Sequence, residues 1–164
     1  MPITSVIPDA ETLTLTVVGD YAVPVERLWA AWTDPRQLER FWGPPTWPAT
    51  FTAFDLRVGG KAEYHMTGPE GQKSGGYWRF TEVHPGRGFT FVDGFCQPDG
   101  TPNDDLPGTI MEMEFESTPG GSRYVAVSRF PSIEAMEQLV AMGMIEGLKA
   151  AQAQLDGVLG LEAA

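Results

Sequence analysis

The segment Thr109–Ser117 reads TIMEMEFES, and its alternation of apolar and charged residues is typical of a β-strand. The odd-numbered positions 111, 113 and 115 hold Met, Met and Phe, whereas the even-numbered positions 112, 114 and 116 all hold Glu. Successive side chains of a strand point to opposite faces of its sheet, so the pattern predicts one apolar face toward a core and one charged face toward water.

Further strands are predicted on both sides of this segment, because period-two alternation interrupted by Gly and Pro turns runs from about residue 46 to residue 130. They are expected at 13–21, 50–58, 61–67, 75–83, 88–95, 109–117 and 122–130. Most connections have hairpin length, and parallel strands would need crossovers of about a dozen residues or more. The sequence therefore predicts an antiparallel sheet of about seven strands.

Helical spacing appears after the first of these strands. Val25, Leu28, Trp29 and Trp32 recur at the period of a helix. Asp34-Pro35 then ends that helix and starts another, with Asp34 as the cap and Pro35 in the first turn. Two short helices are therefore expected between the first and second strands.

The C-terminal segment predicts one long helix from Ser132 to about Leu159. Its expected apolar stripe is Ile133, Met136, Val140, Met144, Leu148, Ala151, Leu155 and Leu159. Only this helix has the length to cover one face of the sheet. The predicted class is α+β, a curved antiparallel sheet wrapped around a long C-terminal helix, with a loose arm over 1–11 and a single domain over 12–160.

Composition excludes several classes of function. The 164 residues include 11 Lys and Arg against 22 Asp and Glu, a net charge of −11, which argues against binding to nucleic acid. The lone Cys96 excludes an intrachain disulfide and fits a reducing compartment. No apolar run approaches the roughly 18 residues of a membrane span, and the N-terminus lacks a signal-peptide pattern. A cytoplasmic protein is expected.

Several short motifs, in this order, resemble a known family. They are the helix pair 25–35, the loop Phe41-Trp42-Gly43-Pro44, the segment Asp55-Leu56-Arg57-Val58-Gly59-Gly60-Lys61, the turn Glu82-Val83-His84-Pro85-Gly86, and Gly120-Gly121-Ser122. Together they resemble the START-like superfamily (helix-grip or Bet v-type, also called SRPBCC), in the branch of the activator of heat-shock protein 90 ATPase homologue. Met142-Gly143-Met144 departs from the Gly-Trp that many members of this branch carry.

The resemblance implies a cavity between the sheet and the last helix. Packing alone would explain the inward apolar residues, but the superfamily includes lipid carriers and hormone receptors, which favours a lined pocket. The predicted ligand-binding residues are Trp42, Tyr64, Met66, Trp78, Phe80, Phe89, Phe91, Met111, Met113, Tyr124, Met136, Val140 and Met144. The hydroxyls of Tyr64 and Tyr124 are expected to orient a polar end of the ligand, and the loop 97–107 is expected to lie at the opening.

No catalytic residue, metal site or cofactor is predicted. His65 and His84, the two histidines, lack a partner at ligand spacing, and neither a nucleophile elbow nor a phosphate-binding glycine loop appears. The leading hypothesis is binding of a small hydrophobic molecule, a lipid or an aromatic metabolite. Two alternatives stay open: a polyketide cyclase or aromatase-like enzyme, which an acid or base deep in the cavity would favour, and a module that activates a chaperone ATPase through its exterior.

Overall fold

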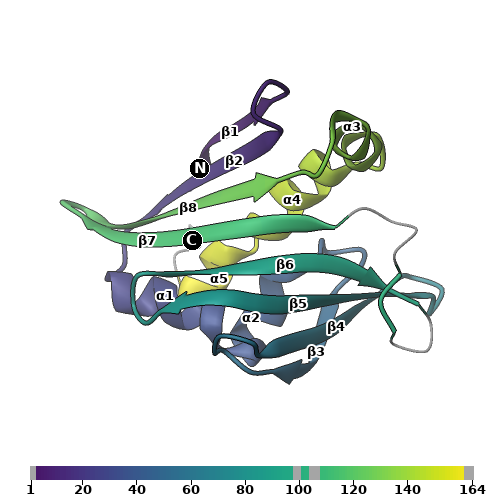
Figure 1. Cartoon of the computed structure of the whole chain (residues 1–164). Coiled ribbons are helices and arrows are strands. Elements are labelled where there is room, and N and C mark those ends of the chain that lie inside the picture. Colours follow the sequence, from purple (N-terminus) through teal and green to yellow (C-terminus); the bar gives the residue numbers. More distant parts are fainter. Residues whose placement is uncertain (1–2, 98–100, 104–107, 161–164) are drawn as a thin grey trace.

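The computed structural model describes residues 3–97, 101–103 and 108–160, and Figure 1 shows their arrangement. Within these residues the chain forms one eight-stranded antiparallel sheet with the order β1-β2-β8-β7-β6-β5-β4-β3. The strands are β1 (Ile3–Asp9), β2 (Thr14–Tyr21), β3 (Ala49–Phe54), β4 (Lys61–Thr67), β5 (Lys73–His84), β6 (Gly88–Cys96), β7 (Thr109–Thr118) and β8 (Gly121–Arg129). The α+β class and the antiparallel pairing are confirmed.

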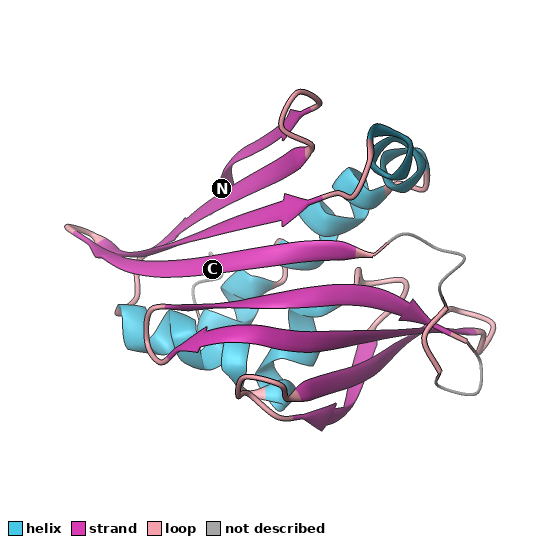
Figure 2. Cartoon of the chain, in the orientation of Figure 1, coloured by secondary structure: helices cyan, strands magenta, loops and turns pink. Residues whose placement is uncertain are grey.

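Five helices complete the described fold: α1 (Val25–Thr33), α2 (Pro35–Trp42), α3 (Ile133–Ala141), α4 (Met144–Gln152) and α5 (Leu155–Leu159). They gather on one side of the sheet, with α1, α2 and α5 at one end and α3 and α4 at the other (Figure 2). The predicted junction of α1 and α2 is confirmed, because the Asp34 side chain accepts a hydrogen bond from the Arg36 amide at 3.0 Å.

The segment 1–11, expected as a loose arm, instead contains an eighth strand. β1 pairs with β2 from Ile3 opposite Gly19 to Asp9 opposite Thr14. Pro8 is compatible with this strand because it lies near the end of an edge strand, where a missing amide hydrogen leaves at most one ladder hydrogen bond unmade. The half-buried Val6 packs against the core from this strand.

The single long C-terminal helix was also a wrong prediction. Gly143, with φ of 90°, separates α3 from α4, and a second interruption at 153–154 separates α4 from α5. A positive φ is incompatible with a continuing right-handed helix, and glycine adopts it without steric cost. Within α3 the buried residues are Ala135, Met136 and Leu139, whereas Ile133 and Val140 of the expected stripe are each 36% exposed.

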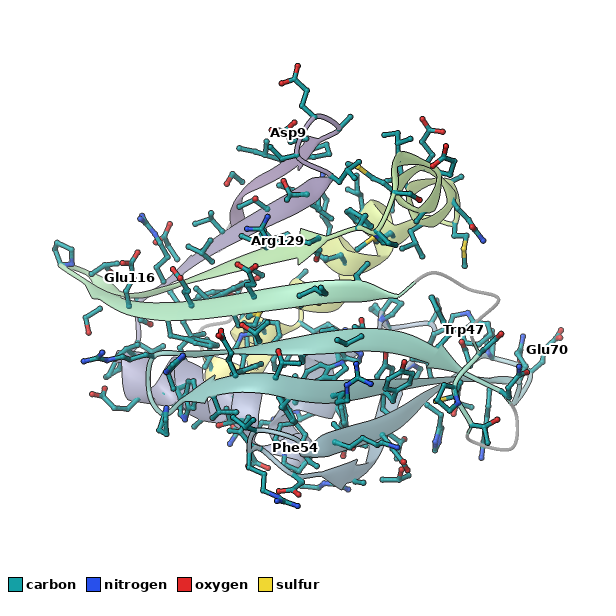
Figure 3. The ribbon with its side chains drawn as sticks, viewed as in Figure 1. Asp9, Trp47, Phe54, Glu70, Glu116 and Arg129 are labelled. Carbon is teal, nitrogen blue, oxygen red and sulfur yellow. The ribbon has the colours of Figure 1, made fainter. Side chains whose placement is uncertain are left out.

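The inward and outward faces of the strands follow the predicted alternation. In β7 the side chains of Met111, Met113 and Phe115 are buried, and Ile110 is 45% exposed on the opposite face. The outer face carries ion pairs such as that between Glu112 of β7 and Arg129 of β8. Figure 3 labels Arg129 on β8 and Glu116 toward the other end of β7.

Aromatic side chains fill the space between the sheet and the helices α1, α2 and α5. Trp78 stacks on Phe91 with ring centroids 4.0 Å apart, and Trp32 meets Phe41 edge to face at 5.0 Å. Arg27 of α1 fixes α5 by donating a hydrogen bond to the Val158 carbonyl at 2.6 Å. We call this ring-filled half of the interior, which includes Trp32, Phe41, Trp78 and Phe91, the packed end.

Candidate functional site

A cavity of about 320 Å³ lies at the opposite end, between the sheet and the α3–α4 corner. Its wall is mostly apolar, and its lining residues are Trp42, Pro44, Tyr64, Met66, Asp93, Gly94, Phe95, Thr109, Met111, Ser128, Leu139, Met142, Gly143, Met144, Gly147 and Leu148. Its size and its apolar wall with a few polar groups are typical of small-molecule sites.

The break in the C-terminal segment accounts for this hollow. Gly143 turns the chain between α3 and α4, and Gly147 presents no side chain to the cavity. A Cβ atom built on Gly147 meets no atom within 4 Å, so the helix leaves open space where a larger residue would fill it. Met142 lines the cavity while 55% exposed, and it therefore marks a side where the cavity reaches solvent.

Four polar side chains from four strands line the sheet side of the cavity: Tyr64 from β4, Asp93 from β6, Thr109 from β7 and Ser128 from β8. Thr109 is paired with Asp93 across the β6–β7 ladder. The polar groups thus form a row across an otherwise apolar wall, which gives the cavity one polar side.

Tyr64 reaches Asp93 by crossing an intervening strand. Its hydroxyl donates a hydrogen bond to the Asp93 carboxylate at 3.0 Å, although β5 lies between their two strands. The residue of β5 opposite Tyr64 is Gly76, and a Cβ there would lie 2.4 Å from the tyrosine Cζ and hydroxyl oxygen. The absence of a side chain at Gly76 therefore lets the tyrosine ring lie over the sheet.

Burial raises the pKa of Asp93 from 3.8 to about 7, although the hydrogen bond from Tyr64 acts in the opposite direction. Desolvation disfavours the charged carboxylate, and the lining residues that the structure describes include no cationic side chain. Burial also raises the pKa of Tyr64 well above its ordinary value, and the nearby Asp93 charge adds to this. Asp93 is thus poised to change protonation near neutral pH while Tyr64 stays protonated.

The thirteen residues predicted from the sequence divide between four places. Trp42, Tyr64, Met66, Met111 and Met144 line the cavity. The other residues from the strands are buried in the packed core instead: Trp78, Phe80, Phe89, Phe91, Met113 and Tyr124. Met136 belongs to a smaller apolar cluster with Leu15, Phe130 and Leu139, and Val140 lies on the exposed side of α3.

Tyr124, expected to orient a ligand, instead stacks on Tyr21 within the core at a centroid distance of 5.9 Å. The polar side chain that lies beside Tyr64 on the cavity wall is Asp93, which the sequence prediction did not include. The signal was present, since Asp93 has the same parity in its strand as the inward residues Phe89 and Phe91. A charged residue among apolar ones on an inward face is a stronger indication of function than the aromatic residues around it.

Parts of the loop expected at the opening, 98–100 and 104–107, lie outside the described residues. The described portion is anchored, since the Asn103 amide donates a hydrogen bond to the Phe95 carbonyl at 2.8 Å. Across the described chain, histidine, cysteine and carboxylate side chains do not gather in groups of three that could hold a metal ion. None of its helices combines the length and apolar character needed to cross a membrane.

A curved antiparallel sheet closed by C-terminal helices around one cavity defines a helix-grip domain of the START-like class. Within that class, the chain belongs to the family described as Activator of Hsp90 ATPase homolog 1-like protein, whose profile matches residues 22–160. The predicted family resemblance is confirmed.

Solved structures support the same assignment. A Mycobacterium smegmatis protein, Ms6760, is 45% identical, with coverage of 99% of this chain and 100% of that one and a TM-score of 0.90. A protein from Arthrobacter aurescens is 44% identical, with coverage of 98% and 93% and a TM-score of 0.92. The AHSA1 protein of Silicibacter pomeroyi, at 24% identity, coverage of 92% and 99% and a TM-score of 0.71, shares the fold. No curated protein matches the chain.

Proposed function

We propose that this protein binds a small, largely apolar molecule in the cavity beneath α3 and α4, as a cytoplasmic ligand-binding domain. The observation that supports this most directly is the contrast within one interior: aromatic rings fill the packed end, whereas about 320 Å³ stays open at the other end. Burying apolar ligand surface contributes about 25 cal/mol per Å² before ordering costs. Of the thirteen predicted ligand contacts, the proposal keeps the five that line the cavity.

The cavity wall suits a ligand with one polar end. The thioethers of Met66, Met111 and Met144 are flexible and polarizable, so they adapt to different apolar shapes. The hydroxyl and carboxyl groups lie together on the sheet side and would contact the polar end. This division fixes the orientation of the ligand, since an inverted molecule would leave Asp93 against apolar atoms.

The test is a binding titration with N-phenyl-1-naphthylamine, an uncharged probe whose fluorescence rises in apolar surroundings. Gly147→Leu places a side chain into the open space and is expected to weaken binding about tenfold or more, because it removes ligand contact area. Ala150→Leu, on the exposed side of the same helix, is the matched control and should bind as the parent protein does. Equal binding by all three proteins would refute the cavity as the site.

Native mass spectrometry of freshly purified protein, followed by solvent extraction, tests the same proposal without a chosen probe. A recurrent apolar species that is lost in Gly147→Leu and retained in Ala150→Leu would support it. Protein that is consistently empty and indifferent to a panel of apolar molecules would instead favour a module that acts on a protein partner, as the name of the family suggests.

Asp93 favours a second candidate function, proton transfer to or from a bound molecule. General acid–base catalysis works best with a pKa near the operating pH, and Asp93 has one of about 7 on the cavity wall. A cyclase-like reaction would use this carboxyl as the acid or base. Turnover of a polyketide-type substrate that falls at least about a hundredfold in Asp93→Asn would distinguish catalysis from binding.

A further inference from the structure

We propose that the cavity selects apolar molecules that carry a basic amine and rejects carboxylates of the same shape. This inference rests on the proposed ligand-binding function and specifies the chemical class of the ligand. It starts from the charges available on the cavity wall. Among the described lining residues, Asp93 and Tyr64 are the titratable groups, so the wall can be neutral or negative.

The geometry around Asp93 suits a cation. One carboxylate oxygen accepts the Tyr64 hydrogen bond, which leaves further acceptor positions for a ligand N–H. Thr109, its cross-strand neighbour, adds a hydroxyl oxygen on the same wall. A protonated amine beside Asp93 would neutralise a carboxylate that otherwise lies in apolar surroundings, and the pair would form a charge-assisted hydrogen bond.

Aromatic faces add to this preference. Trp42 and Tyr64 meet edge to face with centroids 5.9 Å apart, and both line the cavity together with Phe95. A cation over such a ring is attracted by the negative face of the π system, most strongly for Trp. A ligand carboxylate meets the opposite conditions, because it would face both Asp93 and the ring faces without a positive partner.

The same arrangement makes amine binding depend on pH. Asp93 must ionise to pair with the amine, so affinity should rise as the pH increases through about 7, below the pKa of a typical alkylamine. The groups that face Asp93 do not offset this. Tyr64 of β4 stays protonated, Thr109 and Met111 of β7 do not titrate, and the lining residues of α3 and α4 carry no charge; Cys96 lies three residues along its own strand.

The experiment compares three probes with one carbon skeleton: 4-phenylbutylamine, 4-phenylbutanol and 4-phenylbutyrate. Calorimetric titration at pH 8 should show the amine binding about tenfold or more tightly than the alcohol, with the carboxylate weakest. In Asp93→Asn the amine should fall to the affinity of the alcohol. Glu114→Gln removes one negative charge from the exposed outer face of β7 and should keep the full preference.

The outcomes separate the two proposals. Binding of the three probes with similar affinity, or an amine preference that survives in Asp93→Asn, would overturn amine selection while the cavity remains a binding site. Failure of all three probes and of the uncharged naphthylamine probe would overturn the ligand-binding function itself. An amine affinity that does not change between pH 6 and pH 8 would also contradict the pairing with Asp93.

Discussion

The two ends of this interior are built against the same sheet and differ in what the helices bring to it. At the packed end, α1 and α2 supply large side chains such as Trp32 and Phe41, both fully buried. At the other end, α3 and α4 meet the sheet with methionines and leucines, and with Gly143 and Gly147. Rings fill the first space, whereas short or absent side chains leave the second open.

Dense packing and open space thus occupy different parts of one core, and the proposed ligand site lies in the open part. Dense aromatic packing leaves no space for a ligand. A cavity, in contrast, lacks the dispersion contacts that side chains filling it would have made. The two ends also differ in charge, because the titratable side chain Asp93, whose pKa is raised, lies on the wall of the open end. Each prediction below alters one side of this comparison.

The largest effect is expected from a charge placed in the packed end. Met113→Arg puts a cation among buried rings without a partner and should destabilise the fold by about 4 kcal/mol or more. Chemical denaturation followed by circular dichroism measures this. The neighbouring Glu114→Arg, on the exposed face of the same strand, should change the free energy of unfolding by less than about 0.5 kcal/mol. Similar losses in both variants would contradict the register of β7.

Asp93→Asn is expected to stabilise the protein in a pH-dependent manner. Because burial raises the pKa of Asp93 from 3.8 to about 7, the folded parent binds this proton more tightly than the unfolded chain. The parent therefore loses stability as the pH rises through this interval, on the order of 2–4 kcal/mol in total, and the asparagine variant does not.

Denaturation curves for both proteins between pH 4.5 and pH 8 measure the difference between their free energies of unfolding. The difference in unfolding free energy should widen as the pH rises from 4.5 to 7 and flatten only toward pH 8, where Asp93 is mostly ionised in the folded protein. A stability difference that stays constant across this range would show that Asp93 does not titrate there. The open end of the interior would then differ from the packed end in packing but not in charge.

Gly76→Ala tests the position of Tyr64 with one methyl group. The new Cβ would lie 2.4 Å from the tyrosine ring and must displace it, at a cost of about 1–3 kcal/mol. The phenol would move away from Asp93, which a change in the Tyr64 and Asp93 NMR signals would report. Gly120→Ala, where an added Cβ meets no atom within 4 Å, should leave both stability and these signals unchanged. Unaltered signals in Gly76→Ala would refute the role of this glycine.

The smallest effect is expected within α4. Gly147→Ala adds a methyl group to open space inside a helix and should raise the free energy of unfolding by about 0.5–1 kcal/mol, the difference in helix propensity. Gly143→Ala should act in the opposite direction, because φ of 90° is unfavourable for alanine. Thermal unfolding of both variants gives the sign of each change in the free energy of unfolding. Changes of the same sign would contradict the helix break at Gly143.

The sequence predicted the sheet and the two short helices because alternation and a capping Asp-Pro are local signals. It failed for β1, since Ile3–Asp9 is ordered by hairpin pairing with the adjacent strand β2 rather than by an alternating pattern of its own. It also failed to separate the aromatic residues of the packed end from those of the cavity. Parity assigns a side chain to a face, but the helix opposite that face decides whether the space is filled.

The contact between Asp93 and Tyr64 is the part of the candidate site that could not be predicted from the sequence. Its parity was readable, but the hydrogen bond that Tyr64 donates to it spans two strand spacings and depends on Gly76 between them. No local pattern encodes a contact between residues 64 and 93. The helix break at Gly143 was similarly ambiguous, because a lone glycine inside a helical pattern is often tolerated.

The corner at Gly143 divides the end of the chain into parts with different attachments. α5 is tied to α1 through Arg27, and Gln154 donates a hydrogen bond to the Gly43 carbonyl at 2.7 Å. The helices α3 and α4, which cover the cavity, precede these two hydrogen bonds in the chain. Substitutions in α3 and α4 therefore leave both hydrogen bonds in place. The shape of the cavity can therefore change through substitutions in α3 and α4 without disturbing the attachment of α5 to the rest of the domain.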